Sequence, residues 1–341
     1  MIPRLLRKVT FQTGAPAVGQ RRGPEIDVSR LWWTPPLSPR QAWLLERRQI
    51  EAGLDCRAFI SLTDHDSIEA PLMLRVLEDS RKTPISVEWT IPFGETFFHL
   101  GVHNMAPCSA RSLFAEMELY TKRPGPQRLK ELLAGLHEDP AVLIVLNHPL
   151  WDEKGIGRDR HRQTAERLLH EHRNFIHALE LNGFRRQREN LLVEEMAAAW
   201  RLPVVSGGDR HGREPNANVN LTNAGSFEEF VDEIRNGRSS DVLWMSQCRE
   251  DLALRFLRAV CDVLRDDPQH GLGWSRWNDR VFCRCDDGVA RPLSAIWGDR
   301  EAPPVLGRLV GLVHLLDRCL THPRLRAALR PSSPGEEEAG L

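Results

Sequence analysis

The stretch Ser61-Leu-Thr-Asp-His-Asp-Ser67 places an imidazole between two carboxylates directly after a short apolar run. Two further stretches repeat this arrangement: Asn147-His-Pro149 follows the apolar run 142–146, and Ser206-Gly-Gly-Asp-Arg-His211 follows the run 203–205. A short apolar run is typical of a buried β-strand, and in α/β barrels the residues just past the carboxyl ends of the strands carry the chemistry. Three strand ends with oxygen and imidazole ligands predict a metal site assembled from distant parts of the chain.

The composition is that of an ordinary globular protein with enough apolar residues for a large core. The chain has 341 residues, of which 41% are hydrophobic and 27% charged, and its formal net charge is −1. This length suits one α/β barrel with an extension or two ordinary domains. The near-zero charge gives no reason to expect nucleic acid or a membrane surface as a partner; the oligomeric state stays open.

Two further features bear on the compartment. No apolar run reaches the length of a signal peptide core or a membrane span. Seven cysteines at irregular spacing argue against a disulfide framework, and Cys283-Arg-Cys285 is interpreted as two strand residues that face the same way. We therefore expect a cytoplasmic protein.

The sequence pattern changes along the chain and divides it into four parts. Residues 1–26 are rich in Gly, Pro and Arg and are expected to form a flexible arm. Residues 27–245 alternate short apolar runs with amphipathic stretches, which predicts parallel strands joined by crossover helices. Residues 246–330 lack this rhythm and are expected to form a helical extension, and the tail 331–341 is expected to be disordered.

Capping signals mark where some helices begin. Ser38 followed by Pro39 is typical of an N-cap with proline in the first turn, and Ser226 with Glu229 forms a capping box. The expected strands are 57–62, 85–90, 96–102, 142–146, 178–181 and 203–206, and the expected helices are 39–53, 68–79, 127–137, 158–172, 189–200 and 226–237.

Glu88 and His99 each lie inside a strand-like run. Glu88 stands among apolar neighbours in Ser86-Val-Glu-Trp89, and burying a carboxylate is costly unless a positive group compensates it. His99 lies in Phe97-Phe-His-Leu-Gly101, and His103, four residues on, falls on the same strand face as a weaker candidate. A pair of metal ions bridged by Glu88 would compensate its charge.

The other candidates follow strands. Pro149 fixes a loop that could aim the His148 ring inward, and Asp209 and His211 flank Arg210 after a Gly pair that would let the backbone approach an anion closely. The predicted metal ligands are His65, Glu88, His99, His148, Asp209 and His211, and mixed imidazole and carboxylate ligation suits Zn, Mn or Fe better than Ca.

Each candidate also has a structural interpretation. Asp64 or Asp66 could simply cap the helix that follows, and a single histidine on an apolar strand is more often a core residue than a ligand. Arg210 could form a structural salt bridge rather than clamp a phosphate. Six independent structural explanations are nevertheless less economical than one site.

In order and spacing, these motifs resemble those of the polymerase and histidinol phosphatase (PHP) superfamily. The resemblance covers roughly residues 27–240 and implies a distorted seven-stranded (β/α) TIM-like barrel, up to three metal ions at its C-terminal mouth, and phosphoester hydrolysis. It implies that Glu88 bridges two ions, that His99 and His148 complete one, that Asp209 holds the other, and that His65 and His211 serve a third. The matching segments are Thr63-Asp-His-Asp66, Val87-Glu88, His99-Leu-Gly101, Asn147-His-Pro149, Leu179-Glu-Leu-Asn182 and Gly208-Asp-Arg-His211.

The chain departs from the superfamily at its first motif, an Asp-x-His-x-His run on the first strand. The matching position is Asp27-Val-Ser-Arg-Leu-Trp-Trp33, where Ser29 and Leu31 replace the two histidines, and no histidine precedes His65. One metal therefore loses two of its expected ligands. We expect two ions of Mn, Fe or Zn rather than three.

The expected function is hydrolysis of a small phosphate ester by a metal-bound hydroxide. Asp64, His65 and Arg210 are the predicted catalytic residues, and Arg210 with the ions would neutralise the oxyanion. One alternative is a catalytically silent barrel that acts as a binding or regulatory module, which the missing histidine pair favours. Another is a metallohydrolase that acts on carbon esters or amides.

Overall fold

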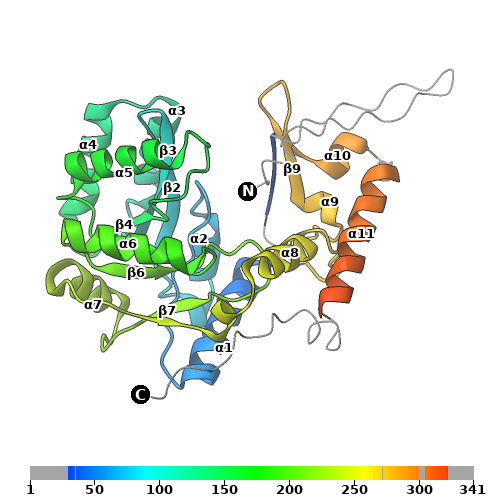
Figure 1. The fold of residues 1–341 in the computed structure, drawn as a ribbon, viewed down its shortest axis with the longest axis horizontal. Coiled ribbons are helices and arrows are strands. Elements are labelled where there is room, and N and C mark those ends of the chain that lie inside the picture. The colour runs from blue at the N-terminus through cyan, green and yellow to red at the C-terminus, as the bar shows by residue number, and fades with distance from the viewer. Residues whose placement is uncertain (1–29, 35, 271, 299–303, 322–341) are drawn as a thin grey trace, which may run out of the picture. The chain divides into compact units, whose positions relative to one another are not determined.

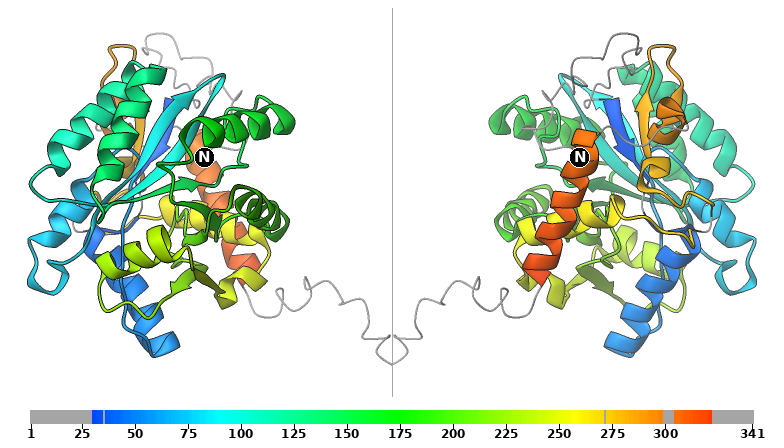
Figure 2. Two further views of the ribbon diagram at one scale, coloured as in Figure 1. Left: turned by 90° about the vertical axis from the view of Figure 1, so that its left-hand side faces the viewer. Right: turned by 90° about the vertical axis from the view of Figure 1, so that its right-hand side faces the viewer.

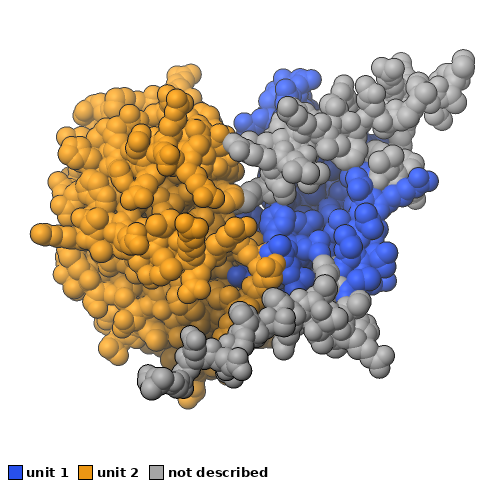
Figure 3. All heavy atoms as spheres, viewed as in Figure 1, with its two compact units in different colours: residues 1–36, 211–213, 253–341 blue, residues 37–210, 214–252 orange. Residues whose placement is uncertain are grey.

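The computed structural model describes residues 30–34, 36–270, 272–298 and 304–321, and these fall into two compact units (Figure 3). Unit 2 consists of residues 37–210 and 214–252, and unit 1 contains residues up to 36, residues 211–213 and the chain from residue 253 onward. The expected arm 1–26 and tail 331–341 lie outside the described residues.

Unit 2 is built on a five-stranded mixed sheet (Figure 1). The first three strands pair antiparallel and the last three pair parallel. In sheet order the strands are β2 (Ile85–Phe93), β3 (Thr96–Met105), β4 (Leu143–Asn147), β5 (Ala178–Asn182) and β6 (Val204–Gly207). The expected α/β class and these five strands are confirmed.

The described strands do not close into the expected seven-stranded barrel. A tight turn at Gly94 and Glu95 joins β2 directly to β3, so these two strands form a hairpin, whereas parallel barrel strands each need a crossover helix. The expected strand 57–62 is also absent. Its place is taken by irregular chain that ends in a single bridge between His65 and Glu88.

The helices of unit 2 pack beside this sheet (Figures 1 and 2). Ser38 caps the first of them by a capping box with Gln41, and the Ser226 side chain accepts a hydrogen bond from the Glu229 N–H, as the sequence predicts. The α-helices are α1 (Pro39–Leu54), α2 (Glu69–Arg75), α3 (Ala110–Lys122), α4 (Pro126–Glu138), α5 (Arg158–His172), α6 (Gln187–Trp200) and α7 (Phe227–Asp232). Short 3₁₀ or π turns span Glu78–Ser80, Glu233–Gly237 and Ser246–Arg249, and β7 (Asn218–Leu221) pairs antiparallel with β8 (Asp241–Trp244).

One face of the sheet packs into the main apolar core, whereas the other face carries both polar side chains and a smaller apolar cluster around Val145 and Ala178. Val87, Trp89 and Leu100 are fully buried in the main core with residues of α3 to α6, and the Trp89 indole N–H donates to the Met117 carbonyl and to Thr121. Since strand side chains alternate between faces, Glu88 lies on the face opposite Val87 and Trp89. The strand pairing then sets Glu88 beside Gly101 and sets His99 beside Asn147.

Unit 1 contains a three-stranded antiparallel sheet as well as helices. The sheet order is β1 (Leu31–Trp33), β9 (Val281–Arg284) and β10 (Ala290–Pro292), and the helices are α8 (Leu252–Val263), α9 (Trp277–Arg280), α10 (Leu293–Trp297) and α11 (Pro304–Thr321). A purely helical extension from residue 246 is therefore not what forms. Val281 and Cys283, two residues apart on β9, pair with Trp33 and Leu31 of β1 and pack with them in one apolar cluster. These segments therefore form strands instead of helices.

Leu31 was expected on the first strand of the barrel, beside the metal ligands. Instead, Leu31 pairs with Cys283 in the sheet of unit 1, where both side chains pack with Val281, Leu293 and Trp297. Ser29, the other substituted position, lies outside the described residues. The seven cysteines, all of which the structure describes, form no disulfide with one another. None of the described helices is both long and apolar enough to cross a membrane.

His177, just before β5, is one of several buried histidines that make the stability of unit 2 sensitive to acid. Its Nδ1 accepts a hydrogen bond from the Ile144 N–H at 2.9 Å, and its Nε2 lies 2.8 Å from His137 Nδ1. Burial, aided by Arg235, lowers the pKa of His177 to about 3, whereas an unfolded histidine titrates near pH 6.5. The neutral ring therefore contributes stability above about pH 6.5. This contribution, at most about 5 kcal/mol, is lost as the pH falls toward 3.

Replacing His177 with asparagine should make the free energy of unfolding less sensitive to acid. The asparagine oxygen can accept the Ile144 hydrogen bond without titrating. Urea denaturation between pH 7 and pH 4 measures the effect, with the exposed His170→Asn as control. If His177→Asn and wild type lost stability equally over this range, the assigned role of the neutral ring would be wrong.

Candidate metal centre

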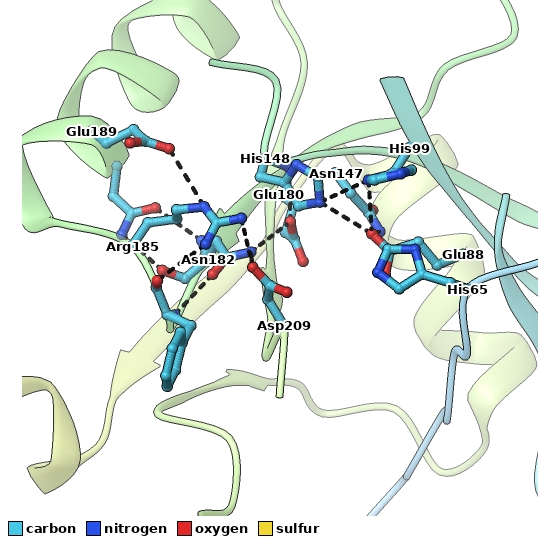
Figure 4. A network of polar contacts seen from close by, with 12 residues as sticks. His65, Glu88, His99, Asn147, His148, Glu180, Asn182, Arg185, Glu189 and Asp209 are labelled. Carbon is cyan, nitrogen blue, oxygen red and sulfur yellow. Dashed lines mark hydrogen bonds and ion pairs between the residues drawn. The ribbon is translucent and has the colours of Figure 1, made fainter. Parts of the chain in front are cut away.

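Three imidazoles surround the buried carboxylate of Glu88 (Figure 4). His148 Nε2 lies 3.1 Å and His99 Nδ1 3.6 Å from Glu88 Oε1, and His65 Nε2 lies 3.6 Å from Glu88 Oε2. His99 Nδ1 and His148 Nε2 lie 3.2 Å apart. Four of the six predicted ligands are therefore brought together in one place.

These distances fit the ligand shell of one small ion. Ligand atoms about 2.0–2.1 Å from a tetrahedral zinc ion lie about 3.3–3.4 Å from one another, and the separations around Glu88 run from 3.1 to 3.6 Å. His65, Glu88 and His99 each bring one ligand atom within 4.8 Å of the other two; His148 is not part of this group of three, although its Nε2 lies close to both Glu88 and His99. The residues present could thus hold a divalent metal ion.

Local structure holds each ligand in place. Glu88 and His99 are fixed by the ladder of β2 and β3, and the Asn147 amide at the end of β4 donates to Glu88 Oε1 at 3.1 Å. His148 has a positive φ of 29°, which is uncommon for a residue with a side chain. Its backbone N–H donates to Glu180 Oε2 at 2.7 Å, and this bond secures the turn that directs the ring toward Glu88.

The charges of the cluster are strongly coupled. Burial opposes ionisation of Glu88, yet His65, His148 and His99 together hold its pKa well below the usual range. Burial lowers the pKa of His99 to about 3. For His148, the hydrogen bond and charge of Glu88 overcome burial and raise the pKa to about 9. Glu88 is therefore an anion that shares a proton with His148, and a metal ion would replace that proton.

The two predicted acids after residue 63 have different roles. Asp66 accepts the Thr90 N–H at 2.8 Å, and neither Asp64 nor Asp66 caps α2, whose N-cap is Ile68. The helix-cap interpretation is therefore wrong.

Burial raises the pKa of Asp64, although His65 and Arg210 favour its charged form. The side chain of His65 is half exposed, so this edge of the cluster is open.

Asp209 is held by an arginine that the sequence did not single out. Arg185 Nη2 lies 2.7 Å from Asp209 Oδ2, and both side chains are only 6% exposed. Arg185 also lies 4.1 Å from the Trp151 ring centroid and 3.8 Å from Glu189. Figure 4 shows this group beside the imidazole cluster, linked to it through Asn182 and Glu180.

The last two candidates lie farther along the same loop. Arg210 Nη2 pairs with the buried Glu46 at 3.0 Å, which confirms a salt bridge, while its Nη1 is buried without a hydrogen-bond partner. His211 belongs to unit 1, where its ring stands edge-on to Trp33; its role as a ligand stays a prediction. His103 hydrogen-bonds to Ser61 at 2.8 Å instead of joining the cluster.

Glu180 is a second residue that sequence reasoning left without a role. It lies in the quoted segment Leu179-Glu-Leu-Asn182, and a carboxylate in a fully buried strand was the available signal. Burial raises the pKa of Glu180 to about 7. It supports His148 through the backbone and does not contact the ring nitrogens.

Replacing Gly207 with alanine should weaken metal binding without touching a ligand. A Cβ at this position would lie 1.5 Å from Glu180 Oε1 and 2.2 Å from its Cδ, so Glu180 would have to leave the His148 N–H. Loss of such a supporting contact typically costs about 10- to 100-fold in metal affinity. Titration against a chromogenic chelator measures the affinity. The control is Gly135→Ala in α4, where nothing lies within 4 Å; unchanged affinity in Gly207→Ala would contradict this role of Glu180.

No family model matches this chain, and no curated protein matches it. Among solved structures, the chain is similar to a proposed metal-dependent phosphoesterase from Bifidobacterium adolescentis, with 14% identity over 60% of this chain and 92% of that one, and a TM-score of 0.36. It is also similar to an amidohydrolase from Chromobacterium violaceum with bound sulfate and no metal, with 15% identity over 63% and 95% of the two chains and a TM-score of 0.39. Because both TM-scores lie below 0.5, the assignment of a function has to rest on the site itself.

Proposed function

We propose that this chain is a metal-dependent hydrolase that cleaves phosphate esters of small molecules. The observation that carries the proposal is the group of His65, Glu88 and His99, whose ligand atoms lie within 4.8 Å of one another, with His148 Nε2 beside it, 3.1 Å from Glu88 Oε1 and 3.2 Å from His99 Nδ1. A purely structural metal site is closed by its ligands. Here one ligand, His65, is half exposed, which favours a centre that a substrate can reach.

His65, His99 and His148 would hold the ion with the carboxylate of Glu88. An ion of the Zn, Mn or Fe type suits this mixed donor set. When bound, it supplies Lewis acidity at the reacting phosphoryl group. The charge of Glu88 keeps the three imidazoles oriented about one point, and Asn147 fixes the carboxylate by its hydrogen bond at 3.1 Å.

Asp64 and Arg210 supply the remaining chemistry of the proposed reaction. Because burial raises the pKa of Asp64, this carboxyl can hold a proton and deliver it to the leaving oxygen. Its backbone carbonyl accepts the Glu88 N–H at 3.1 Å, which ties it to the ligand strand. Arg210 retains one buried N–H group without a hydrogen-bond partner, and a guanidinium N–H suits a phosphoryl oxygen.

A substrate panel tests the proposal. Protein loaded separately with Zn, Mn or Fe should hydrolyse aryl phosphate monoesters or diesters, and His148→Ala should lower that activity by at least about 100-fold while keeping the fold, since even supporting residues cost about 10- to 100-fold. The matched control is the exposed His170→Ala. Hydrolysis of aryl acetates or anilides alone would instead favour an ester or amide substrate. A metal-loaded protein inactive on every substrate would favour the binding module.

A further inference from the structure

Arg185 is a buried cation placed among three neighbours from different elements. It follows β5, and it contacts Asp209 after β6 at 2.7 Å, Glu189 of α6 at 3.8 Å, and the face of Trp151 after β4 at 4.1 Å. Its side chain is 6% exposed. A guanidinium stays charged at any usable pH, so these carboxylates have a permanent counterion (Figure 4).

Asp209 and Glu180, which Asn182 links, already accept hydrogen bonds. Asn182 Nδ2 lies 3.2 Å from Glu180 Oε2 and 3.3 Å from Asp209 Oδ2. Glu180 Oε2 also accepts the His148 N–H at 2.7 Å. A second metal ion held by Asp209 and Glu180 would have to displace these donors and lie close to the guanidinium, where two positive charges repel each other.

We infer that Arg185, rather than a second metal ion, neutralises the carboxylates of Asp209 and Glu189. The centre then binds one divalent ion instead of two, and the residues around that ion are His65, Glu88, His99 and His148. The inference rests on the metal site of the proposed function and replaces the expectation of two ions. It makes Asp209 a partner of Arg185 instead of a metal ligand. Glu88 then belongs to a single ion and bridges nothing.

Counting metal ions on the purified full-length chain tests this directly. After incubation with excess Zn or Mn and desalting, elemental analysis should give about one ion per chain for wild type, and still one for Asp209→Asn. A count of two in wild type, with one ion lost in Asp209→Asn, would overturn the inference and leave the proposed hydrolase intact. A count near zero in wild type would remove the metal centre itself, and the proposed function with it.

Neutralising Arg185 gives the complementary result. Arg185→Gln leaves Asp209 and Glu189 without their cation, so titration with Mn should reveal a second, weaker ion that wild type does not bind. The control is Arg188→Gln, an exposed arginine of α6, which should bind one ion. If correctly folded Arg185→Gln also stopped at one ion, the charge of Arg185 would not be what excludes the second, and the inference would fail.

Discussion

Replacing Glu88 with glutamine is expected to reduce the bound metal from one ion per chain to near zero and to abolish hydrolysis. Glutamine keeps the size of the side chain and its hydrogen bond with Asn147, but it removes the carboxylate that contacts His65, His99 and His148. A neutral amide oxygen lacks the negative charge of the carboxylate and binds a divalent ion more weakly. Because loss of even a supporting residue costs about 10- to 100-fold, turnover should fall by at least about 100-fold.

The same variant has a readout that needs no metal. The pKa of His148 is raised to about 9 by Glu88, so it should fall in Glu88→Gln, which NMR titration of the metal-free protein can measure. Glu95→Gln is the matched control, because Glu95 lies exposed in the turn of the same hairpin. Metal binding equal to that of wild type in Glu88→Gln would show that the cluster is not the metal centre.

Local sequence was sufficient to identify the residues that meet around Glu88. The pattern of an apolar run followed by a polar side chain depends on alternation along one strand and on the residue at its end, and both can be read without knowing the strand's partner. His99 and His148 come from neighbouring strands, and the ladder between β3 and β4 brings them together. Which ions they hold stays a prediction.

The architecture could not be read in the same way, because strand direction depends on connections and partners. The short turn at Gly94 was a signal for a hairpin, and it makes β2 and β3 antiparallel where a barrel needs parallel strands. The pairing of Leu31 with Cys283 joins residues about 250 positions apart. Such a pairing cannot be predicted from local sequence, because it depends on which distant strands meet in the folded chain.

Arg185 shows the corresponding limit for the site. A single arginine after a strand has no distinctive spacing, and its importance comes from Asp209, Glu189 and Trp151, which reach it from three other segments. The sequence predicts Asp209 as a metal ligand because nothing in it indicates that Arg185 pairs with this carboxylate. The buried guanidinium changes what that carboxylate can bind.

Replacing Arg280 with methionine should lower the free energy of unfolding of unit 1 by about 1–3 kcal/mol. Arg280 is fully buried and donates to the carbonyls of Trp274 at 2.7 Å and Val263 at 3.2 Å, and also to that of Arg265. Replacing a buried charged group with an apolar one can leave the free energy of unfolding unchanged when its partners are replaced too. Here the partners are backbone carbonyls. The Val263 carbonyl, whose hydrogen bond is buried, loses its donor at a cost of about 1–3 kcal/mol, whereas the bonds to Trp274 and Arg265 are only partly buried.

Urea denaturation followed by tryptophan fluorescence measures this loss. Five of the ten tryptophans, including Trp274, Trp277 and Trp297, lie in unit 1 and the other five in unit 2, so both units contribute to the signal. The Nε of Arg280 has no hydrogen-bond partner, which lowers the stability that the buried guanidinium contributes. The three carbonyls still accept their hydrogen bonds from its Nη atoms. The control is Arg284→Met on β9, where the arginine is exposed and the change should cost under about 1 kcal/mol. If the two variants unfolded at the same urea concentration, the three carbonyls would not depend on Arg280 for their hydrogen bonds.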